Sequence, residues 1–119
     1  MLINCTNHRL SEWSAEQISA AEKWGEIIEY PFPDVSPYST SNEIKIQAAE
    51  IADDIVCKNP QAVIVQGEMN MSFAIVSELK KKNICALAAV SERIVNITKA
   101  DDGSIIKTSK FRFAGFREY

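Results

Sequence analysis

The side chains that could do chemistry in this sequence fall into three short polar clusters. The clusters are Asn7-His8; Gln66, Gly67, Glu68 and Asn70; and Ser91 with Arg93. Amides and hydroxyls of these types can bind the bases and sugars of nucleotides, and an arginine grips phosphate oxygens with two parallel hydrogen bonds. Together the clusters predict a site for a phosphodiester-containing ligand, provided that the fold brings them together.

His8 is the only histidine of the chain, and histidine is the side chain that exchanges protons near neutral pH. It could transfer a proton, or it could hydrogen-bond a base or a phosphate. A loop histidine that only caps a turn is the alternative. We expect Asn7 and His8 to hold a base or a ribose.

The second cluster could contact both sugar and phosphate. Gly67 permits a backbone bend or the close approach of a ligand. Asn70 can cap the next helix, whose N-terminal amides attract phosphate, although a cap without a ligand is a strong alternative. Glu68 would repel phosphate, but it could accept hydrogen bonds from ribose hydroxyls or an adenine amino group.

Ser91 and Arg93 form the third cluster, a hydroxyl two residues before a rigid cation. The arginine could offset the charge that builds on a strained phosphodiester. A salt bridge to Glu68 or Glu92 is the alternative. We expect Arg93 to contact the phosphate, with Ser91, Gln66 and Asn70 helping to orient the ligand.

The hydrophobic pattern around these clusters predicts a βαβ unit. Residues 62–65 and 84–90 are apolar runs, and apolar residues 73, 76 and 79 between them recur at helical spacing. In open parallel sheets, ligands bind beyond the carboxyl ends of the strands. Gln66 follows the first predicted strand and Ser91 the second, so we expect both at one edge of the sheet.

The rest of the first 93 residues repeats this alternation. A strand at 2–5 precedes a helix that begins at Ser14 and ends at Gly25, and a short strand at 26–30 precedes a proline-rich loop at 31–39. Thr40 begins a further helix, which stops at Asn59-Pro60. The order β-α-β-α-β-α-β predicts an α/β fold with a three-layer, mostly parallel sheet and helices on both faces.

Residues 94–119 follow a different pattern. Strands at 94–98 and 105–113 flank Asp101-Asp102-Gly103, a strong signal for a β-hairpin turn. Residues 116–119 continue the second strand or pack on it. We therefore expect one domain over residues 1–119, with a core at 1–93 and a C-terminal hairpin and tail at 94–119.

Composition excludes several classes of protein. No apolar run approaches the ~20 residues of a membrane span, and the first residues lack the pattern of a secretory signal, so we expect a cytoplasmic protein. Glycine-rich phosphate loops, a nucleophile elbow and metal motifs are absent, so no cofactor or metal is expected. Cys5, Cys57 and Cys85 each lie in an apolar segment, and we expect all three to be buried.

The net charge of −3 is unevenly distributed. Residues 1–79 carry 12 acidic and 4 basic side chains, which gives −8, whereas residues 80–119 carry 4 acidic and 9 basic ones, which gives +5. A basic half can concentrate potential for an anionic ligand. A solvated basic face is the alternative, and we prefer it for residues 80–82 at a predicted helix end.

The chain resembles the small stand-alone CRISPR-associated proteins of the ring nuclease group, which have a CARF-like Rossmann fold. The resemblance rests on residues 7–8, 13–17, 66–68, 90–93, 102–103, 111–113 and 116–119. It implies a homodimer, without a DNA or membrane partner, that binds a cyclic oligoadenylate, with cyclic tetra-adenylate the expected ring. It further implies metal-independent cleavage by the ribose 2′-hydroxyl, which would damp type III CRISPR antiviral signalling. Arg93, Ser91 and His8 are then the candidate catalytic residues.

Two other functions remain open. The same crevice would serve a protein that sequesters the ring without cutting it. In the other alternative, the chain is an interaction module without a nucleotide ligand, and its basic half faces an acidic partner or RNA.

Overall fold

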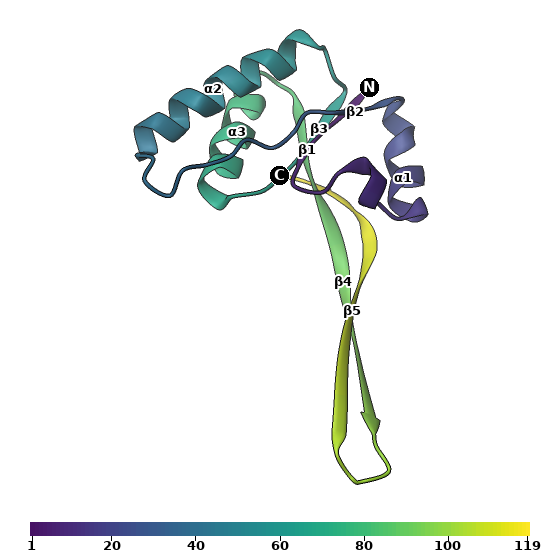
Figure 1. Ribbon diagram of the computed structural model, residues 1–119. Coiled ribbons are helices and arrows are strands. Elements are labelled where there is room, and N and C mark those ends of the chain that lie inside the picture. The colour runs from purple at the N-terminus through teal and green to yellow at the C-terminus, as the bar shows by residue number, and fades with distance from the viewer.

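The computed structural model describes all residues 1–119 and shows an α/β protein built on one sheet (Figure 1). The strands are β1 (Leu2–Thr6), β2 (Ile27–Glu29), β3 (Ala62–Gln66), β4 (Cys85–Lys99) and β5 (Ile105–Glu118), and the helices are α1 (Ala15–Ala21), α2 (Ser41–Cys57) and α3 (Met69–Lys81). Two 3₁₀ turns, η1 (Leu10–Glu12) and η2 (Glu22–Trp24), flank α1. The spatial order is β2-β1-β3-β4-β5. The first four strands are parallel to their neighbours, and β5 is antiparallel to β4.

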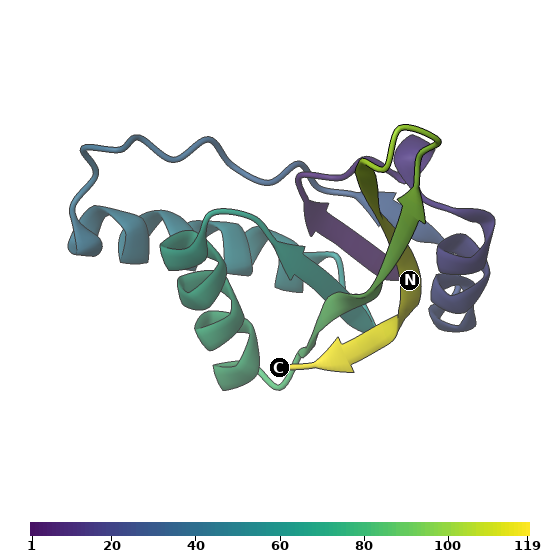
Figure 2. The ribbon, with the colours of Figure 1, turned by 90° about the horizontal axis from the view of Figure 1, so that it is seen from below.

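The central strands are buried on both faces, as their apolar runs predicted. Along β3, Val63 and Val65 contribute to the core cluster that includes the apolar residues of α2 and α3. Ala62 and Ile64, which point to the other face, pack with Trp13 in a second cluster around α1. The prediction of a sheet with helices on both faces is therefore confirmed, as the view from below also shows (Figure 2).

The predicted helix starts are confirmed as well. The Ser14 hydroxyl accepts the backbone N–H of Gln17 at 3.1 Å, and the Thr40 hydroxyl accepts that of Glu43 at 3.1 Å. Each bond satisfies an amide that the first turn of a helix leaves without a partner. Gly25 follows η2 with φ of +91°, a conformation that glycine adopts without strain.

The prediction that a strand ends at Ser91 is wrong. β4 continues through Ser91, Glu92 and Arg93 to Lys99, and the hairpin predicted at 94–113 is the outer part of a ribbon formed by β4 and β5. The boundary expected at residue 93 therefore falls inside a strand. Residues 116–118 continue β5, which was one of the two outcomes expected for the tail.

Residues 91–113 of this ribbon form an arm that projects from the body of the protein (Figure 1). Val90 pairs with Gly115 but Ser91 pairs with Phe113, so Ala114 is an extra residue in β5. Such a β-bulge bends and twists a strand, and here it marks the point where the arm leaves the sheet. The radius of gyration is 17.5 Å, whereas a compact domain of 119 residues would have about 13.5 Å.

The cysteines differ in their environments. Cys5 is fully buried, Cys85 is half-buried and Cys57, at the last turn of α2, is exposed, so the expectation that all three lie in the core is wrong for Cys57. Burial raises the pKa of the Cys5 thiol to about 12. Among the helices, none has the length and apolarity to cross a membrane.

Candidate functional site

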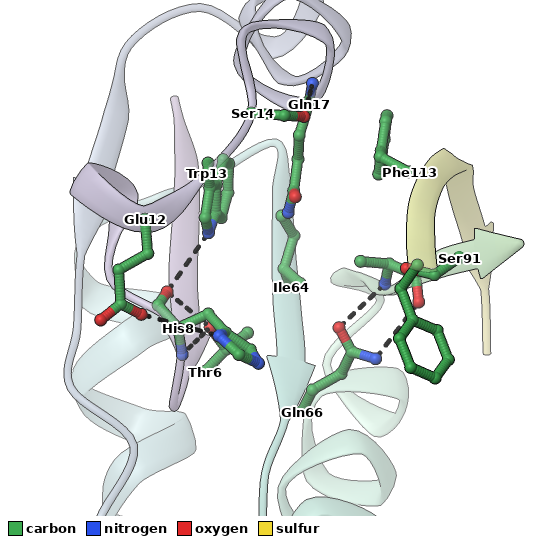
Figure 3. Close-up of a pocket in the computed structure, with 12 residues that line it drawn as sticks. Thr6, His8, Glu12, Trp13, Ser14, Gln17, Ile64, Gln66, Ser91 and Phe113 are labelled. Atoms are coloured by element: carbon green, nitrogen blue, oxygen red, sulfur yellow. Dashed lines mark hydrogen bonds and ion pairs between the residues drawn. The ribbon is translucent and has the colours of Figure 1, made fainter. Parts of the chain in front are cut away.

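A cavity of about 450 Å³ lies beside the carboxyl ends of β1 and β3, where the arm begins (Figure 3). Its walls come from the end of β1 and the loop after it, the start of α1, the end of β3 and the base of the arm. The lining residues are Thr6, His8, Glu12, Trp13, Ser14, Gln17, Ile64, Gln66, Ala89, Ser91, Phe111 and Phe113. We call this cavity the strand-end pocket. Three of the predicted site residues line it, namely His8, Gln66 and Ser91.

The loop that carries His8 is fixed by buried polar groups of β1. The His8 carbonyl accepts the side-chain N–H groups of Asn4 at 2.8 Å and Trp13 at 3.2 Å. The Thr6 hydroxyl accepts the His8 backbone N–H at 3.1 Å and donates to the Asn4 side-chain oxygen at 2.7 Å. Because Asn4 is 3% exposed and Thr6 8%, these bonds are made where water cannot easily replace them. The main chain of His8 is thereby held at the pocket.

The imidazole of His8 has an acidic neighbour. Its Nδ1 atom lies 3.6 Å from a carboxylate oxygen of Glu12, and both side chains are largely exposed. This contact is longer than a hydrogen bond, so Glu12 places a negative charge beside the ring without fixing its tautomer. The pair therefore has the composition of a general base beside a carboxylate, open to a ligand from solvent.

The side chain of Gln66 replaces backbone hydrogen bonds between β3 and β4. Beyond Leu87 no backbone pairing joins β4 to β3, and the Gln66 amide spans the gap. It accepts the backbone N–H of Ala89 at 3.0 Å and donates to the Ala89 carbonyl at 3.2 Å (Figure 3). Gln66 thus shapes the pocket wall as the arm begins to leave the sheet.

Aromatic side chains provide flat apolar surfaces at the pocket. Trp13 and Phe113 line it, and both contact the ring of Phe116, at centroid distances of 6.4 and 5.1 Å. Phe111 also lines the pocket but is 74% exposed, so most of its ring is free to stack. Aromatic faces of this kind bind nucleobases by stacking. The hydroxyls and amides of the other lining residues are the groups that recognise base edges and sugars.

Asn7 and Gly67 lie elsewhere. Asn7 lines a separate cavity of about 320 Å³ on the side of β1 and β2, together with Asn4, Arg9 and Phe32 among others. Gly67 packs closely against Phe32: a Cβ built there would overlap the ring, so a larger residue would have to displace it. The close approach predicted at this glycine is therefore made by a side chain of the protein itself.

The expectation that Asn70 caps the third helix is wrong, because Glu68 does so. The Glu68 carboxylate accepts the backbone N–H groups of Met71 at 2.7 Å and Asn70 at 3.1 Å. These bonds lower the pKa of Glu68 below its usual value, and the bond from Met71 has the largest effect. Since the amides that would attract phosphate already bind a carboxylate, this helix start is not a free anion site.

Arg93 does not line the pocket. It lies on the same face of the arm as Ser91, and its guanidinium donates to the Ser109 hydroxyl at 3.1 and 3.4 Å, toward the tip of the arm. The alternative, a salt bridge to Glu68 or Glu92, is not formed. With Arg93 elsewhere, no lysine or arginine lines the strand-end pocket, and its one acidic side chain is Glu12.

The pocket residues that sequence reasoning missed are chiefly Thr6, Glu12, Trp13 and Gln17. Two signals were present: Glu12 is four residues from His8, and polar Asn4 interrupts an apolar strand. Trp13 and Gln17 flank the predicted helix start at Ser14, and both also reach the pocket. The aromatic wall depends on how the arm packs, which the sequence pattern does not reveal.

The chain matches the model of the family described as "Uncharacterized protein MJ1673 family" over residues 1–117, and it therefore belongs to that family. No curated protein matches the chain. The family description names no activity, so the chemistry of the site carries the functional proposal.

Proposed function

We propose that this protein is a cytoplasmic, homodimeric ring nuclease with a CARF-like Rossmann fold. Its ligand is a cyclic oligoadenylate, with cyclic tetra-adenylate the expected ring, and its role is to damp type III CRISPR antiviral signalling. The ring lies at the dimer interface, so that each protomer contributes an equivalent half of the site. The sheet order β2-β1-β3-β4 and helices on both faces are compatible with such a fold.

One observation carries the proposal: the strand-end pocket combines aromatic faces with a histidine–carboxylate pair. Phe111 and Phe113 suit adenine stacking, and His8 with Glu12 suits proton transfer from a ribose hydroxyl. At about 450 Å³ the pocket is within the ~300–1,000 Å³ range of small-ligand sites. It can hold only part of a four-nucleotide ring, which favours a ligand shared by two protomers.

The proposed reaction needs only the ring and the protein. The ribose 2′-oxygen forms a bond to the adjacent phosphorus while the bond from phosphorus to the 5′-oxygen breaks. The 2′-hydroxyl proton passes to Nε2 of His8, and water returns a proton to the departing 5′-oxygen. The products are a linear chain with a 2′,3′-cyclic phosphate end. Holding the 2′-oxygen in line with the breaking bond supplies much of the acceleration.

Sequestration without cleavage is the second candidate, and the position of Arg93 favours it. Charge building on the phosphate calls for a cation, yet Arg93 is bound to Ser109 and no other arginine or lysine lines the pocket. The Ser109 bonds are exposed, so a bound phosphate could draw the guanidinium back toward Ser91 at low cost. Cleavage requires this movement or a cation from another chain.

The deciding experiment is to incubate cyclic tetra-adenylate with excess protein, denature the mixture and separate the nucleotides by chromatography. Linear products with 2′,3′-cyclic phosphate ends support the nuclease, and an intact ring that raised the melting temperature supports sequestration. A ring that neither changes nor alters the melting temperature contradicts both and favours the interaction module.

Matched variants assign the roles. His8→Ala should abolish cleavage and keep ring binding. Asn7→Ala changes the adjacent residue, which lines a different cavity, and should leave both cleavage and ring binding unchanged. Arg93→Ala should sharply reduce both binding and turnover. Cleavage at the wild-type rate by Arg93→Ala would remove that arginine from the mechanism.

A further inference from the structure

The arm is an uncovered two-stranded ribbon, which is an unstable state for a β-structure. Over its length no residue is buried, and in Figure 1 its outer end lies apart from every other element. A two-stranded hairpin is at best marginally stable in water unless one face packs against something. Ile97 and Ile105 near its tip are 68% and 72% exposed. These features indicate a binding element.

The two faces of the arm differ in charge. In the observed register, one face carries Val95, Ile97 and Ile105 together with Arg93, Lys99 and Lys107, and no acidic side chain. Within residues 91–113, the other face carries one acidic residue, Glu92, together with Lys110 and Arg112, so its net charge is +1 against +3 on the first face. We call the first the basic face of the arm. It is suited to an acidic surface that also accepts aliphatic side chains.

An acidic surface exists on the body of this same chain. Residues 10–30, which include α1, carry five exposed acidic side chains and one lysine, for a net charge of −4. This acidic flank borders the strand-end pocket, because Glu12, Ser14 and Gln17 belong to both. The tip of the arm points away from the acidic flank of its own chain (Figure 1), so the complementary surface that it can reach is on another copy.

We propose that the outer half of the arm binds a second copy of this chain, with its basic face on the partner's acidic flank. A two-fold axis makes the exchange reciprocal, so that each arm covers the other body and both ribbons gain a packed face. The contact also brings Lys99 and Lys107 of each arm to the mouth of a pocket that has no lysine or arginine of its own. The dimer contact stands by itself, and the role of these lysines in ligand binding rests on the proposed function.

The first test is the oligomeric state without any nucleotide, measured by sedimentation velocity across the micromolar range. Wild-type protein should sediment as a dimer. Ile97→Asp should give a folded monomer, because it places a negative charge on the basic face, opposite the partner's acidic flank, and leaves the core unchanged. Thr98→Asp is the matched control: it adds the same charge one residue away on the opposite face and should stay dimeric. The proposal is overturned if the wild-type protein is monomeric, which includes the case in which its arm binds RNA instead. It is also overturned if Ile97→Asp is dimeric.

The second test is a charge exchange. Lys99→Glu/Lys107→Glu places acids against the acidic flank, and Glu16→Lys/Glu22→Lys places lysines against the basic face, so each variant alone should be monomeric. In a mixture of the two, both arm–flank contacts have opposite charges again, and heterodimers should form and weaken with added salt. Failure of the mixture to associate, with both variants folded, overturns the charge assignment.

The third test separates the dimer from the nuclease. If the lysines act across the interface, Lys99→Ala/Lys107→Ala mixed with His8→Ala should regain cleavage, because in the heterodimer one pocket keeps His8 and receives the arm that has both lysines. Inactive mixtures of confirmed heterodimers overturn the lysine role and leave the dimer standing. If wild-type dimers neither bind nor cleave the ring, the proposed function fails and the arm contact does not.

Discussion

Replacing Thr6 with valine should destabilise the protein and loosen the loop of His8. The two side chains have nearly the same shape, so the change removes a hydroxyl and little else. Two groups lose their partner: the Asn4 side-chain oxygen, which accepts at 2.7 Å, and the His8 backbone N–H, which donates at 3.1 Å. Because Thr6 is 8% exposed and Asn4 3%, water cannot readily take the place of the hydroxyl.

The magnitude follows from the cost of buried unpaired groups. Of the two groups, the Asn4 oxygen is buried whereas His8 is exposed, so the full cost of an unpaired buried group, ~1–3 kcal/mol, applies once. The added valine methyl offsets a little of it, so the expected loss is about 2 kcal/mol. At ~2.1 cal/mol/K per residue, the unfolding entropy of a 119-residue chain is about 0.25 kcal/mol/K, so this loss lowers the melting temperature by about 8 °C.

Calorimetry measures the stability, and amide hydrogen exchange at His8 measures the loop. Thr6→Ser keeps the hydroxyl and should retain the slow exchange, and Thr98→Val makes the same chemical change on the exposed arm and should leave the melting temperature unchanged. If Thr6→Val melts with the wild type and the His8 amide exchanges no faster, the buried bonds do not hold this loop.

Three further predictions concern the neighbouring elements. Glu68→Gln should lower the melting temperature at neutral pH, and its difference from wild type should vanish in acid. A lowered carboxyl pKa adds stability above the unfolded-state pKa, and this stability is lost as pH falls through the folded-state pKa. Equal melting curves at neutral pH contradict the cap. Gly67→Ala should destabilise the wild type strongly but cost little in a Phe32→Ala background, a difference that a double-mutant cycle measures. An alkylating reagent should label Cys57 in the native protein and Cys5 only after unfolding, since burial keeps the Cys5 thiol protonated, and mass spectrometry identifies the labelled residue.

The sheet could be predicted because its signals are local. A strand buried on both faces, such as residues 62–66, is apolar throughout, and Ser14 and Thr40 carry the side-chain oxygens that helix starts need. The strand end at Ser91 could not be found this way, because a polarity change marks the end of burial and not the end of hydrogen bonding. β4 leaves the core at that point and remains paired with β5 to Lys99.

The site was predictable in part for the same reason. His8 follows β1 and Gln66 is the last residue of β3, and these neighbouring parallel strands end at the same edge, so both residues line the pocket. Asn7 and Glu68 follow the same strands but serve a second cavity and a helix cap, because adjacent loop residues point in different directions. Only the direction of each side chain separates the two groups, and the one-dimensional pattern does not contain it.

The fold separates the acidic and basic parts of the chain, because the basic face lies on the arm. Acidic side chains gather on the body and beside the strand-end pocket, and the acid-free basic face lies on a ribbon that reaches away from it. A lone protomer therefore holds its cationic surface and its aromatic-lined pocket in separate places. A phosphodiester ring needs both at once, so its tight binding should depend on protein concentration and fall with the fraction of dimer. Ring affinity for Ile97→Asp equal to that of wild type would break this link between assembly and ligand.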